Sequence, residues 1–276
     1  MTAVLITGCS SGIGRATALR LARRRDLTVY ATARRTETLT DLAAAGCRVL
    51  ALDVTDEKSM AAAVQAVEAE HGAVGVLVNN AGYGEYGTVE ETSLDRVRDQ
   101  FETNVFGPAR LIQLTLPGMR TARRGRIINV SSMGGRFVFP IGAYYHASKF
   151  AVEAVSDALR FEVAPFGIAV SVIEPGLIRT GFEDVAQRTL SQSEVPTGPY
   201  GKLTAAARAA TTRSYRSRMM AAEPDAVARV IERAVTARRP RTRYVITPVA
   251  RFMIHTRRLL GARAFDALLR SQFRTA

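Results

Sequence analysis

Near its beginning the chain reads Ala3-Val-Leu-Ile-Thr-Gly-Cys-Ser-Ser-Gly-Ile-Gly14, a short apolar run that turns through three glycines into a helical pattern. Glycines at 8, 12 and 14 let the backbone bend sharply and approach a diphosphate, whose charge the N-terminus of the next helix stabilises. An ordinary strand-to-helix turn is the alternative, but it needs neither three glycines nor two adjacent hydroxyl groups. We therefore expect a dinucleotide to contact Gly8, Ser10, Ser11, Gly12, Ile13 and Gly14.

The alternation of strand and helix continues outward from this loop. Short runs rich in Val, Ile and Leu predict strands, and longer segments of 3.6-residue periodicity predict amphipathic helices. The predicted strands are Ala3–Thr7, Thr28–Thr32, Arg48–Leu52, Val74–Asn79, Arg126–Ser131, Ile168–Glu174 and Arg243–Thr247. The predicted helices are Arg15–Arg24, Lys58–His71, Leu94–Arg120, Ser148–Ala164 and Pro224–Arg238. This order specifies an α/β fold, a doubly wound, mainly parallel seven-stranded Rossmann sheet with helices on both faces.

The last third of the chain departs from this regular pattern. Residues 1–247 are predicted to form a single Rossmann-type domain, in which 182–222 are rich in Ser, Thr, Ala and Arg and predict an irregular insertion. Because ligands bind beyond the carboxyl ends of the strands in such folds, we expect this insertion to be a substrate lid. Residues 248–276 predict a basic amphipathic extension of two helices separated by Gly261.

The residues after the second predicted strand favour NADP over NAD. An NAD site places Asp or Glu there to accept the ribose hydroxyl, whereas a 2′-phosphate is bound by arginine. The chain continues with Arg34 and Arg35 and has no carboxylate before Glu37. Arg34 is therefore the predicted ligand of the 2′-phosphate, with a solvated surface arginine as the alternative.

Tyr145 and Lys149 lie four residues apart in a helical pattern and therefore project from one face. An ammonium group beside a phenol favours the tyrosinate, so we expect it to lower the phenol pKa from about 10 toward neutrality. The chain contains 35 Arg but only three Lys, and a compact ammonium differs chemically from a guanidinium. The pair is therefore a candidate general acid and base at an alcohol or carbonyl oxygen.

With these motifs the chain closely resembles the classical short-chain dehydrogenase/reductase (SDR) family. The resemblance also rests on Asp53-Val54, Asn79-Asn80-Ala81-Gly82, Asn104, Ser132 thirteen residues before Tyr145, and Pro175-Gly176 followed by Thr180. It covers residues 1–182 in full and 224–247 more loosely. Within the family, the chain looks most like 17β-hydroxysteroid and retinol dehydrogenase-type members.

The resemblance implies a role for each matching residue. Tyr145 would be the acid/base and Ser132 would bind the substrate oxygen, while Lys149 would bind the nicotinamide ribose and perturb Tyr145. Asn104 would anchor a proton-relay water. Further cofactor contacts are implied for Asp53 at the adenine, Val54, Asn80 on the adenosine ribose side, Ala81, Gly82, Pro175 and Gly176, and for Ile178 and Thr180 at the nicotinamide carboxamide. The implied protein is an NADP-dependent ketoreductase or alcohol dehydrogenase that works by hydride transfer.

The expected substrate is a bulky apolar alcohol or ketone, as the resemblance suggests. Apolar residues beside the predicted active helix and in the insertion are candidate walls of its pocket, although ordinary packing of the lid on the core explains each of them equally well. The candidate pocket residues are Phe137, Phe139, Ile141, Phe182, Tyr215 and Met219.

The net charge of +13 lies entirely in the C-terminal segment. Residues 1–200 contain 21 basic and 21 acidic side chains, whereas 201–276 contain 17 and 4. Basic helices can bind nucleic acid or lie on anionic membranes, and they can equally cap a pocket, pack at a subunit interface or stay solvated. We expect lid or interface packing before peripheral membrane contact. We expect no nucleic-acid partner, because no recognition motif is present and no aromatic residues interleave with the basic ones.

Composition limits the remaining classes of function. No uncharged run exceeds 14 residues, so no transmembrane helix is expected. The N-terminus lacks a signal-peptide pattern and Cys9 and Cys47 form no disulfide framework, so we expect a cytoplasmic protein. The three histidines have no partners at metal-ligand spacing, so no metal is expected. We also expect a homo-oligomer, a dimer or tetramer. A regulatory or scaffold protein that binds the cofactor is the alternative to an enzyme, but the complete catalytic set argues against it.

Overall fold

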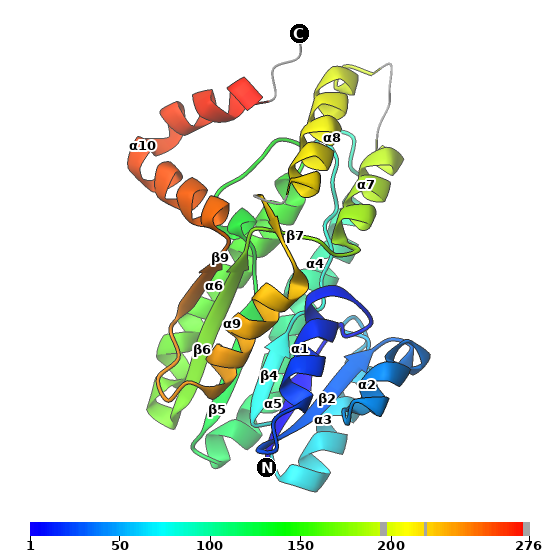
Figure 1. Cartoon of the computed structure of the whole chain (residues 1–276), viewed down its shortest axis with the longest axis vertical. Coiled ribbons are helices and arrows are strands. Elements are labelled where there is room, and N and C mark those ends of the chain that lie inside the picture. Colours follow the sequence, from blue (N-terminus) through cyan, green and yellow to red (C-terminus); the bar gives the residue numbers. More distant parts are fainter. Residues whose placement is uncertain (194–197, 218–219, 273–276) are drawn as a thin grey trace.

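Seven parallel strands form the central sheet in the computed structural model of the protein, which describes residues 1–193, 198–217 and 220–272 (Figure 1). Their spatial order is β3-β2-β1-β4-β5-β6-β9. The strands are β1 (Thr2–Ile6), β2 (Leu27–Ala33), β3 (Arg48–Ala51), β4 (Val76–Asn79), β5 (Gly125–Val130), β6 (Ile168–Pro175) and β9 (Arg243–Ile246). The predicted doubly wound fold is confirmed, and every predicted strand agrees with an observed one to within two residues at each end.

The order of the strands reverses at β1. The chain passes from β1 to β2 and β3 on one side and then crosses to β4 on the other, so that Val4 is in register with both Val29 and Val76. The central strands are covered on both faces, and all four residues of β4 are buried. At such a reversal a crevice opens beyond the carboxyl ends of the strands, which is where ligands bind in this architecture.

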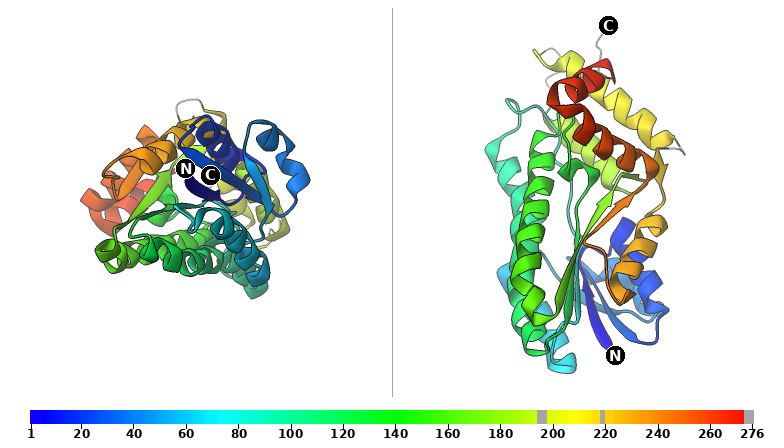
Figure 2. Two further views of the ribbon diagram at one scale, coloured as in Figure 1. Left: turned by 90° about the horizontal axis from the view of Figure 1, so that it is seen from below. Right: turned by 90° about the vertical axis from the view of Figure 1, so that its left-hand side faces the viewer.

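Helices cover the two faces of the sheet, as the edge-on view in Figure 2 shows. One face carries α1 (Gly12–Ala22), α2 (Thr40–Ala44) and α9 (Pro224–Thr236), and the other carries α3 (Glu57–His71), α4 (Leu94–Phe101), α5 (Gly107–Thr121) and α6 (Ala143–Val163). Each face has its own apolar core. The first includes Val4 and Ile6, and the second includes Leu5, because successive side chains of a strand point to opposite faces.

The insertion after the sixth strand is helical. It consists mainly of α7 (Phe182–Ser193) and α8 (Gly201–Arg216), and a two-stranded sheet of β7 (Leu177–Ile178) and β8 (Ala221–Ala222) lies at its base. The prediction of irregular structure was wrong, and for α8 the reason is its run of alanines, which favours helix.

The chain ends in α10 (Pro248–Gln272), which bends at Gly261, where φ is 70° and ψ is −178°. Both helical segments predicted around Gly261 are therefore present. Phe265 and Leu269 of the second segment are buried in a third core cluster with Phe137. We call α7, α8 and α10 the cap, since they lie together beyond the carboxyl ends of the strands (Figures 1 and 2). Within the described ranges, no helix is long and apolar enough to cross a membrane.

Candidate active site

The glycine loop between β1 and α1 is held by the residues that follow β4. Nδ2 of Asn80 donates to the carbonyl oxygens of Thr7 and Gly8, at 2.8 and 3.1 Å. The Thr7 hydroxyl accepts from the backbone N–H groups of Asn80 and Ala81, at 3.0 and 2.9 Å. Gly8 has a φ of 72°, and a Cβ there would lie 2.9 Å from Cα of Ala81. Only glycine fits this close approach and this backbone conformation.

Gly14 has a different role from the other two glycines. A Cβ at Gly14 would lie 2.3 Å from the carbonyl oxygen of Gly8 and 2.5 Å from Nδ2 of Asn80. The structure places Gly14 behind the loop and not in the wall of the cavity described next, in contrast to the predicted cofactor contact. Its missing side chain instead lets α1 pack directly under the loop.

A cavity of about 1620 Å³ lies between the glycine loop, the carboxyl ends of the strands and the cap. This volume exceeds the roughly 300–1,000 Å³ of ordinary ligand pockets and has room for a dinucleotide beside a second molecule. The predicted cofactor residues in its wall are Gly8, Ser10, Ser11, Gly12, Ile13, Arg34, Asp53, Val54, Asn80, Ala81, Gly82, Tyr145, Lys149, Pro175, Gly176, Ile178 and Thr180. The fold thus collects these residues, which are distant in sequence, around one space.

Arg34 stands at the carboxyl end of β2 on the rim of this cavity. Its side chain is exposed and forms no ion pair or hydrogen bond with any residue that the structure describes. Arg15 of α1, by contrast, is paired with Asp41 at 2.6 Å. The carboxylate of Asp53 accepts from the N–H and hydroxyl of Thr55, at 3.0 and 2.8 Å, and so fixes the turn after β3. Arg34 is therefore a cation available to an anionic ligand.

Three of the four predicted catalytic side chains, Ser132, Tyr145 and Lys149, face the cavity. Ser132 follows β5, and its hydroxyl accepts from the N–H of Gly134 at 3.0 Å. Tyr145 lies at the start of α6 and Lys149 lies one turn later, and both are buried. Nζ of Lys149 donates to the carbonyl oxygen of Val130 at 3.0 Å and lies 6.0 Å from the ring centre of Tyr145.

Burial, not the neighbouring ammonium group, dominates the ionisation of Tyr145. Burial raises the pKa of the phenol to about 12, and the hydrogen bond with the Ser132 hydroxyl, which lowers this pKa, is the smaller of the two effects. The expectation that Lys149 lowers this pKa is not met, because the ammonium is directed to Val130 and is itself buried. Burial lowers the pKa of Lys149 to about 8, and the charge of Glu153 opposes that shift. Tyr145 is therefore protonated at neutral pH.

Asn104 lies behind the cavity wall, in a π-helical turn, η2 (Glu102–Phe106), that interrupts the predicted helix Leu94–Arg120. Its Nδ2 donates to the carbonyl oxygen of Tyr83 at 2.8 Å and to Oγ of Ser148 at 3.1 Å. Oγ of Ser148 donates in turn to the carbonyl oxygen of Tyr145 at 2.7 Å. Such turns are frequent at functional sites, and this one ties the loop after β4 to the active helix. The anchoring of a water by Asn104 stays a prediction.

Four of the six predicted substrate residues line the cavity, namely Phe139, Ile141, Phe182 and Tyr215. The prediction was wrong for Phe137, which is 1% exposed and packs edge-on against Phe139 and Phe265, with ring centres 5.0 and 5.5 Å apart. It is a core residue because α10 covers it. Met219 lies outside the described residues.

Among the wall residues that the sequence analysis missed, Tyr86 and His146 lie closest to Tyr145. Tyr86 stacks on Tyr145 with ring centres 5.6 Å apart, but it lies in an irregular stretch after β4 that carries no local signal. His146 follows Tyr145, and its Nε2 accepts from the N–H of Phe139 at 3.0 Å while Nδ1 donates to the carbonyl oxygen of Gly134 at 2.9 Å. Burial lowers the pKa of His146 to about 4, so the neutral ring holds the wall loop against α6.

A partly buried ionic cluster lies behind Lys149. The guanidinium of Arg243 in β9 contacts Glu153, Asp157 and Glu174, at 3.0, 2.6 and 3.1 Å. Glu153 lies one turn after Lys149 on α6, so the cluster connects the outer strands of the sheet to the active helix. No group of three or more His, Cys, Asp or Glu side chains in the described part of the chain could hold a metal ion.

Known proteins share both the sequence and this arrangement. Residues 2–190 match the family model for short chain dehydrogenase. The chain is 44% identical over 182 residues to 3-ketodihydrosphingosine reductase of Bacteroides thetaiotaomicron, a match that covers 66% of this chain and 65% of that protein. It is 36% identical over 294 residues to estradiol 17-beta-dehydrogenase 1 of Rattus norvegicus, which covers 99% of this chain and 82% of that protein.

Solved structures show the same fold. A short-chain dehydrogenase from Streptomyces avermitilis superposes with a TM-score of 0.77 at 34% identity, covering 98% of this chain and 96% of that one. A metagenomic short-chain oxidoreductase in complex with NADP gives 0.69 at 27% identity, with 90% and 97% covered. A short chain dehydrogenase/reductase from Burkholderia phymatum in complex with NAD gives 0.78 at 25% identity, with 100% and 96% covered. The chain therefore belongs to the classical short-chain dehydrogenase/reductase family of NAD(P)-binding oxidoreductases, which act on alcohol and carbonyl groups.

Proposed function

We propose that this protein is an NADP(H)-dependent oxidoreductase that interconverts a carbonyl and an alcohol on an apolar substrate, with Tyr145 as the general acid and base. The observation that carries the proposal is the meeting of Ser132, Tyr145 and Lys149 with the glycine loop around one cavity of about 1620 Å³. Neither the loop nor the trio alone would define a reaction, whereas together they place an acid beside a site shaped for a dinucleotide.

The residues present fit a nicotinamide dinucleotide. Gly8 and Gly12 line the cavity with bare backbone, and Ser10 and Ser11 add hydroxyl groups at the N-terminus of α1, where a diphosphate is stabilised. Ile178 and Thr180 also line the cavity, and Thr180 adjoins the glycine loop, since a Cβ at Gly12 would lie 3.1 Å from Cγ2 of Thr180. When bound, the cofactor supplies or accepts the hydride.

The chain's own side chains supply the proton and stabilise the charge on the substrate oxygen. The phenol of Tyr145 and the hydroxyl of Ser132 both line the cavity, so both can donate to an oxygen that becomes negative as a carbonyl is reduced. Because Tyr145 is protonated at neutral pH, it is ready to act as the acid. In the opposite direction it must lose that proton, and the buried Lys149 ammonium is the cation that would stabilise the resulting anion.

Arg34 supports a preference for NADP. It is the first residue after β2 and carries an unpaired guanidinium on the cavity rim, where a 2′-phosphate would lie. A ribose-binding carboxylate is missing from this position, since the chain offers none before Glu37.

Aromatic and aliphatic walls support an apolar substrate. Phe182 and Tyr86 both contact the Tyr145 ring, with ring centres 5.5 and 5.6 Å from it, and Phe139, Ile141 and Tyr215 extend the apolar lining. The names of the two similar proteins, 3-ketodihydrosphingosine reductase and estradiol 17-beta-dehydrogenase 1, both refer to bulky, largely apolar compounds.

The proposal is tested by measuring NADPH oxidation by the purified protein with a panel of ketones of increasing apolar size. We expect turnover with bulky apolar ketones, lower kcat/KM with short polar ones, and lower kcat/KM with NADH than with NADPH. Tight NADPH binding without oxidation by any ketone would overturn the proposal and favour a cofactor-binding regulatory protein.

A further inference from the structure

The outer face of α10 exposes large apolar side chains, although its inner face is well packed. Phe252, Leu259 and Leu260 are 66%, 81% and 50% exposed, whereas Met253 and Phe265 are buried, at 8% and 1% exposed. The two leucines directly precede Gly261, so they occupy the bend of the helix, at the outer edge of the cap (Figure 1). Exposed leucines at a protruding bend indicate a contact with something apolar.

Cations surround this apolar bend. Residues 248–272 contain five arginines and one carboxylate, that of Asp266. Arg251, Arg258 and Arg263 are exposed, and neither Arg258 nor Arg263 forms an ion pair with the part of the chain that the structure describes. An exposed apolar bend surrounded by free arginines is complementary to a surface that is negatively charged outside and apolar below it.

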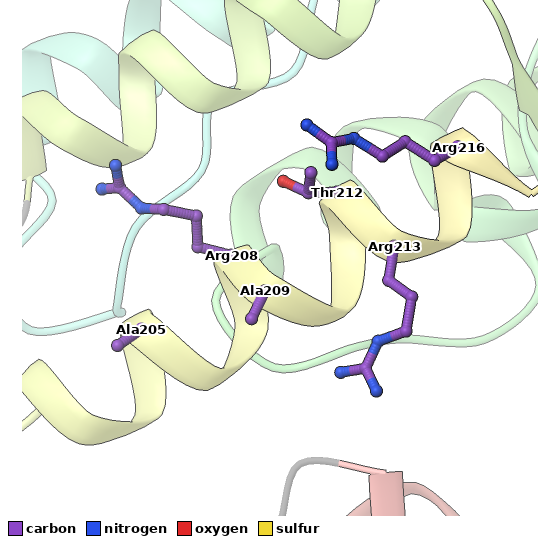
Figure 3. Close-up of a pocket in the computed structure, with 6 residues that line it drawn as sticks. All are labelled: Ala205, Arg208, Ala209, Thr212, Arg213 and Arg216. Atoms are coloured by element: carbon purple, nitrogen blue, oxygen red, sulfur yellow. The ribbon is translucent and has the colours of Figure 1, made fainter.

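The neighbouring helix of the cap adds to this positive charge. Arg208, Arg213 and Arg216 of α8 line an open pocket of about 680 Å³, and Figure 3 shows Arg208 and Arg216 extending from the same side of the helix as Thr212, while Arg213 extends in another direction. Cations on α8 and α10 thus lie at the same end of the molecule, far from the N-terminus (Figures 1 and 2).

The exposed surface adjoins the cavity. Phe252 is two thirds exposed and also lines the cavity, together with Val249 and Met253 from the same turn of α10. Phe252 is therefore part of both the outer face of α10 and the wall of the cavity that contains Tyr145. A compound dissolved in a membrane could enter the cavity beside Phe252.

We infer that the outer face of α10, with Leu259 and Leu260 at its tip and Arg251, Arg258 and Arg263 around it, docks on the surface of an anionic phospholipid bilayer from which the substrate is taken. The role in substrate uptake rests on the proposed function, whereas the docking itself does not. A second copy of the chain is a poor occupant of this face, because two such surfaces would oppose like charges.

The docking is tested by cosedimentation of the full-length protein with vesicles of phosphatidylcholine, and with vesicles of equimolar phosphatidylcholine and phosphatidylglycerol. We expect binding only to the anionic vesicles, released by salt. Arg258→Gln combined with Arg263→Gln is expected to weaken binding roughly 25-fold, since each cation near an anionic bilayer contributes a factor of about five. Leu259→Ser combined with Leu260→Ser is expected to weaken it about tenfold or more.

Two matched controls distinguish binding through the outer face of α10 from nonspecific effects of net charge and of exposed apolar side chains. Arg238→Gln with Arg239→Gln removes the same charge from an exposed loop at the opposite end of the sheet, and Phe161→Ser removes an apolar side chain that is 80% exposed on α6. Both control variants should bind vesicles as the wild type does. All variants should keep their turnover with a water-soluble ketone.

Three outcomes would overturn the inference. The first is a wild-type protein that stays in the supernatant with anionic vesicles. The second is an equal loss of binding in the loop variant and in the α10 arginine variant, which would show that net charge alone drives adsorption. The third is a loss of self-association in the leucine variant, seen by light scattering, which would make this face a contact between copies. Because sedimentation needs no turnover, a failed reductase assay would leave the docking result unaffected.

Discussion

The sheet half of the molecule and the cap hold their functional residues in different ways. Ser132, Tyr145 and Lys149 project from the carboxyl end of β5 and from α6, where buried backbone and hydrogen bonds fix them. The cap instead contributes apolar side chains from helices that are inserted after the sixth strand or appended after the last. Charge is balanced over residues 1–200, whereas 201–276 carry 17 basic and 4 acidic side chains.

This difference separates the chemistry from substrate access. Proton transfer tolerates only small displacements of the reacting groups, so it requires the rigid end of the sheet. Binding an apolar molecule needs only a wall of suitable shape, which two or three helices can supply. Substitutions in the sheet half should therefore change turnover, cofactor affinity or stability, whereas those in the cap should change the handling of the substrate.

The largest effect is expected from Tyr145→Phe. Loss of the hydroxyl should lower kcat by about 10²- to 10⁴-fold, the usual contribution of general acid catalysis, while NADPH affinity measured by fluorescence titration changes little. The matched control is Tyr144→Phe, which removes the adjacent hydroxyl that donates to the carbonyl of Val89 at 3.2 Å. Near-normal turnover of the Tyr145 variant would contradict the mechanism.

Removal of the guanidinium at the cavity rim should have the next largest effect. Arg34→Ala is expected to weaken NADPH binding about tenfold to 100-fold and NADH binding hardly at all, because only NADPH carries the 2′-phosphate. Titration of both cofactors against Arg34→Ala and Arg35→Ala measures this, since Arg35 is exposed but does not line the cavity. Equal losses for the two cofactors would mean that Arg34 does not contact the phosphate.

The packing of α1 under the glycine loop can be broken with a single methyl group. Gly14→Ala places a Cβ 2.3 Å from the Gly8 carbonyl oxygen and should lower the free energy of unfolding by about 1–3 kcal/mol. Gly181→Ala should stay within about 0.5 kcal/mol of the wild type, since nothing lies within 4 Å of its Cβ position. Urea denaturation without cofactor compares the two variants. Equal free energies of unfolding would show that the glycine loop can move to accommodate the added methyl group.

A variant of the cap should affect the substrate alone. Phe182→Ala removes a ring 5.5 Å from that of Tyr145 and is expected to raise KM for a bulky apolar ketone about tenfold, with NADPH affinity unchanged. Phe161→Ala, on the outer surface of α6, is the control for loss of an aromatic side chain. If the Phe182 variant also lost NADPH affinity about tenfold, the expectation that the cap affects only the substrate would be contradicted.

The smallest effect is a shift of pH dependence. Burial lowers the pKa of Lys149 to about 8, and the charge of the Glu153 carboxylate opposes this shift. Glu153→Gln removes that charge, so Lys149 should lose its proton at a lower pH. The alkaline limb of the pH profile of kcat/KM should then shift to lower pH by about one unit. Asp157→Asn is the control, because Asp157 also contacts Arg243 but lies one turn further from Lys149. An identical shift in both variants would trace the effect to Arg243 instead.

Local sequence patterns predicted the fold and most of the candidate site. Each of the informative patterns spans only a few residues. They are the glycines at 8 and 12, the Tyr145–Lys149 pair and the apolar runs that predict strands. The errors arose where distant segments meet. Phe137 was assigned to the cavity because nothing near it in sequence shows that Phe265 would cover it. Tyr86 was missed because its stacking partner, Tyr145, lies 59 residues further along the chain.

The sequence by itself determined the doubly wound sheet, the position of the glycine loop, the chemistry available at Tyr145 and the uneven placement of charge, because periodicity, turn residues and residue type are local properties. Only the tertiary structure decided that burial governs the phenol pKa, that Gly14 packs behind the loop, and that the two faces of α10 differ, one closing the cavity and the other exposed with its arginines. These properties depend on which surfaces are removed from water, and that is settled only when segments distant in sequence pack together.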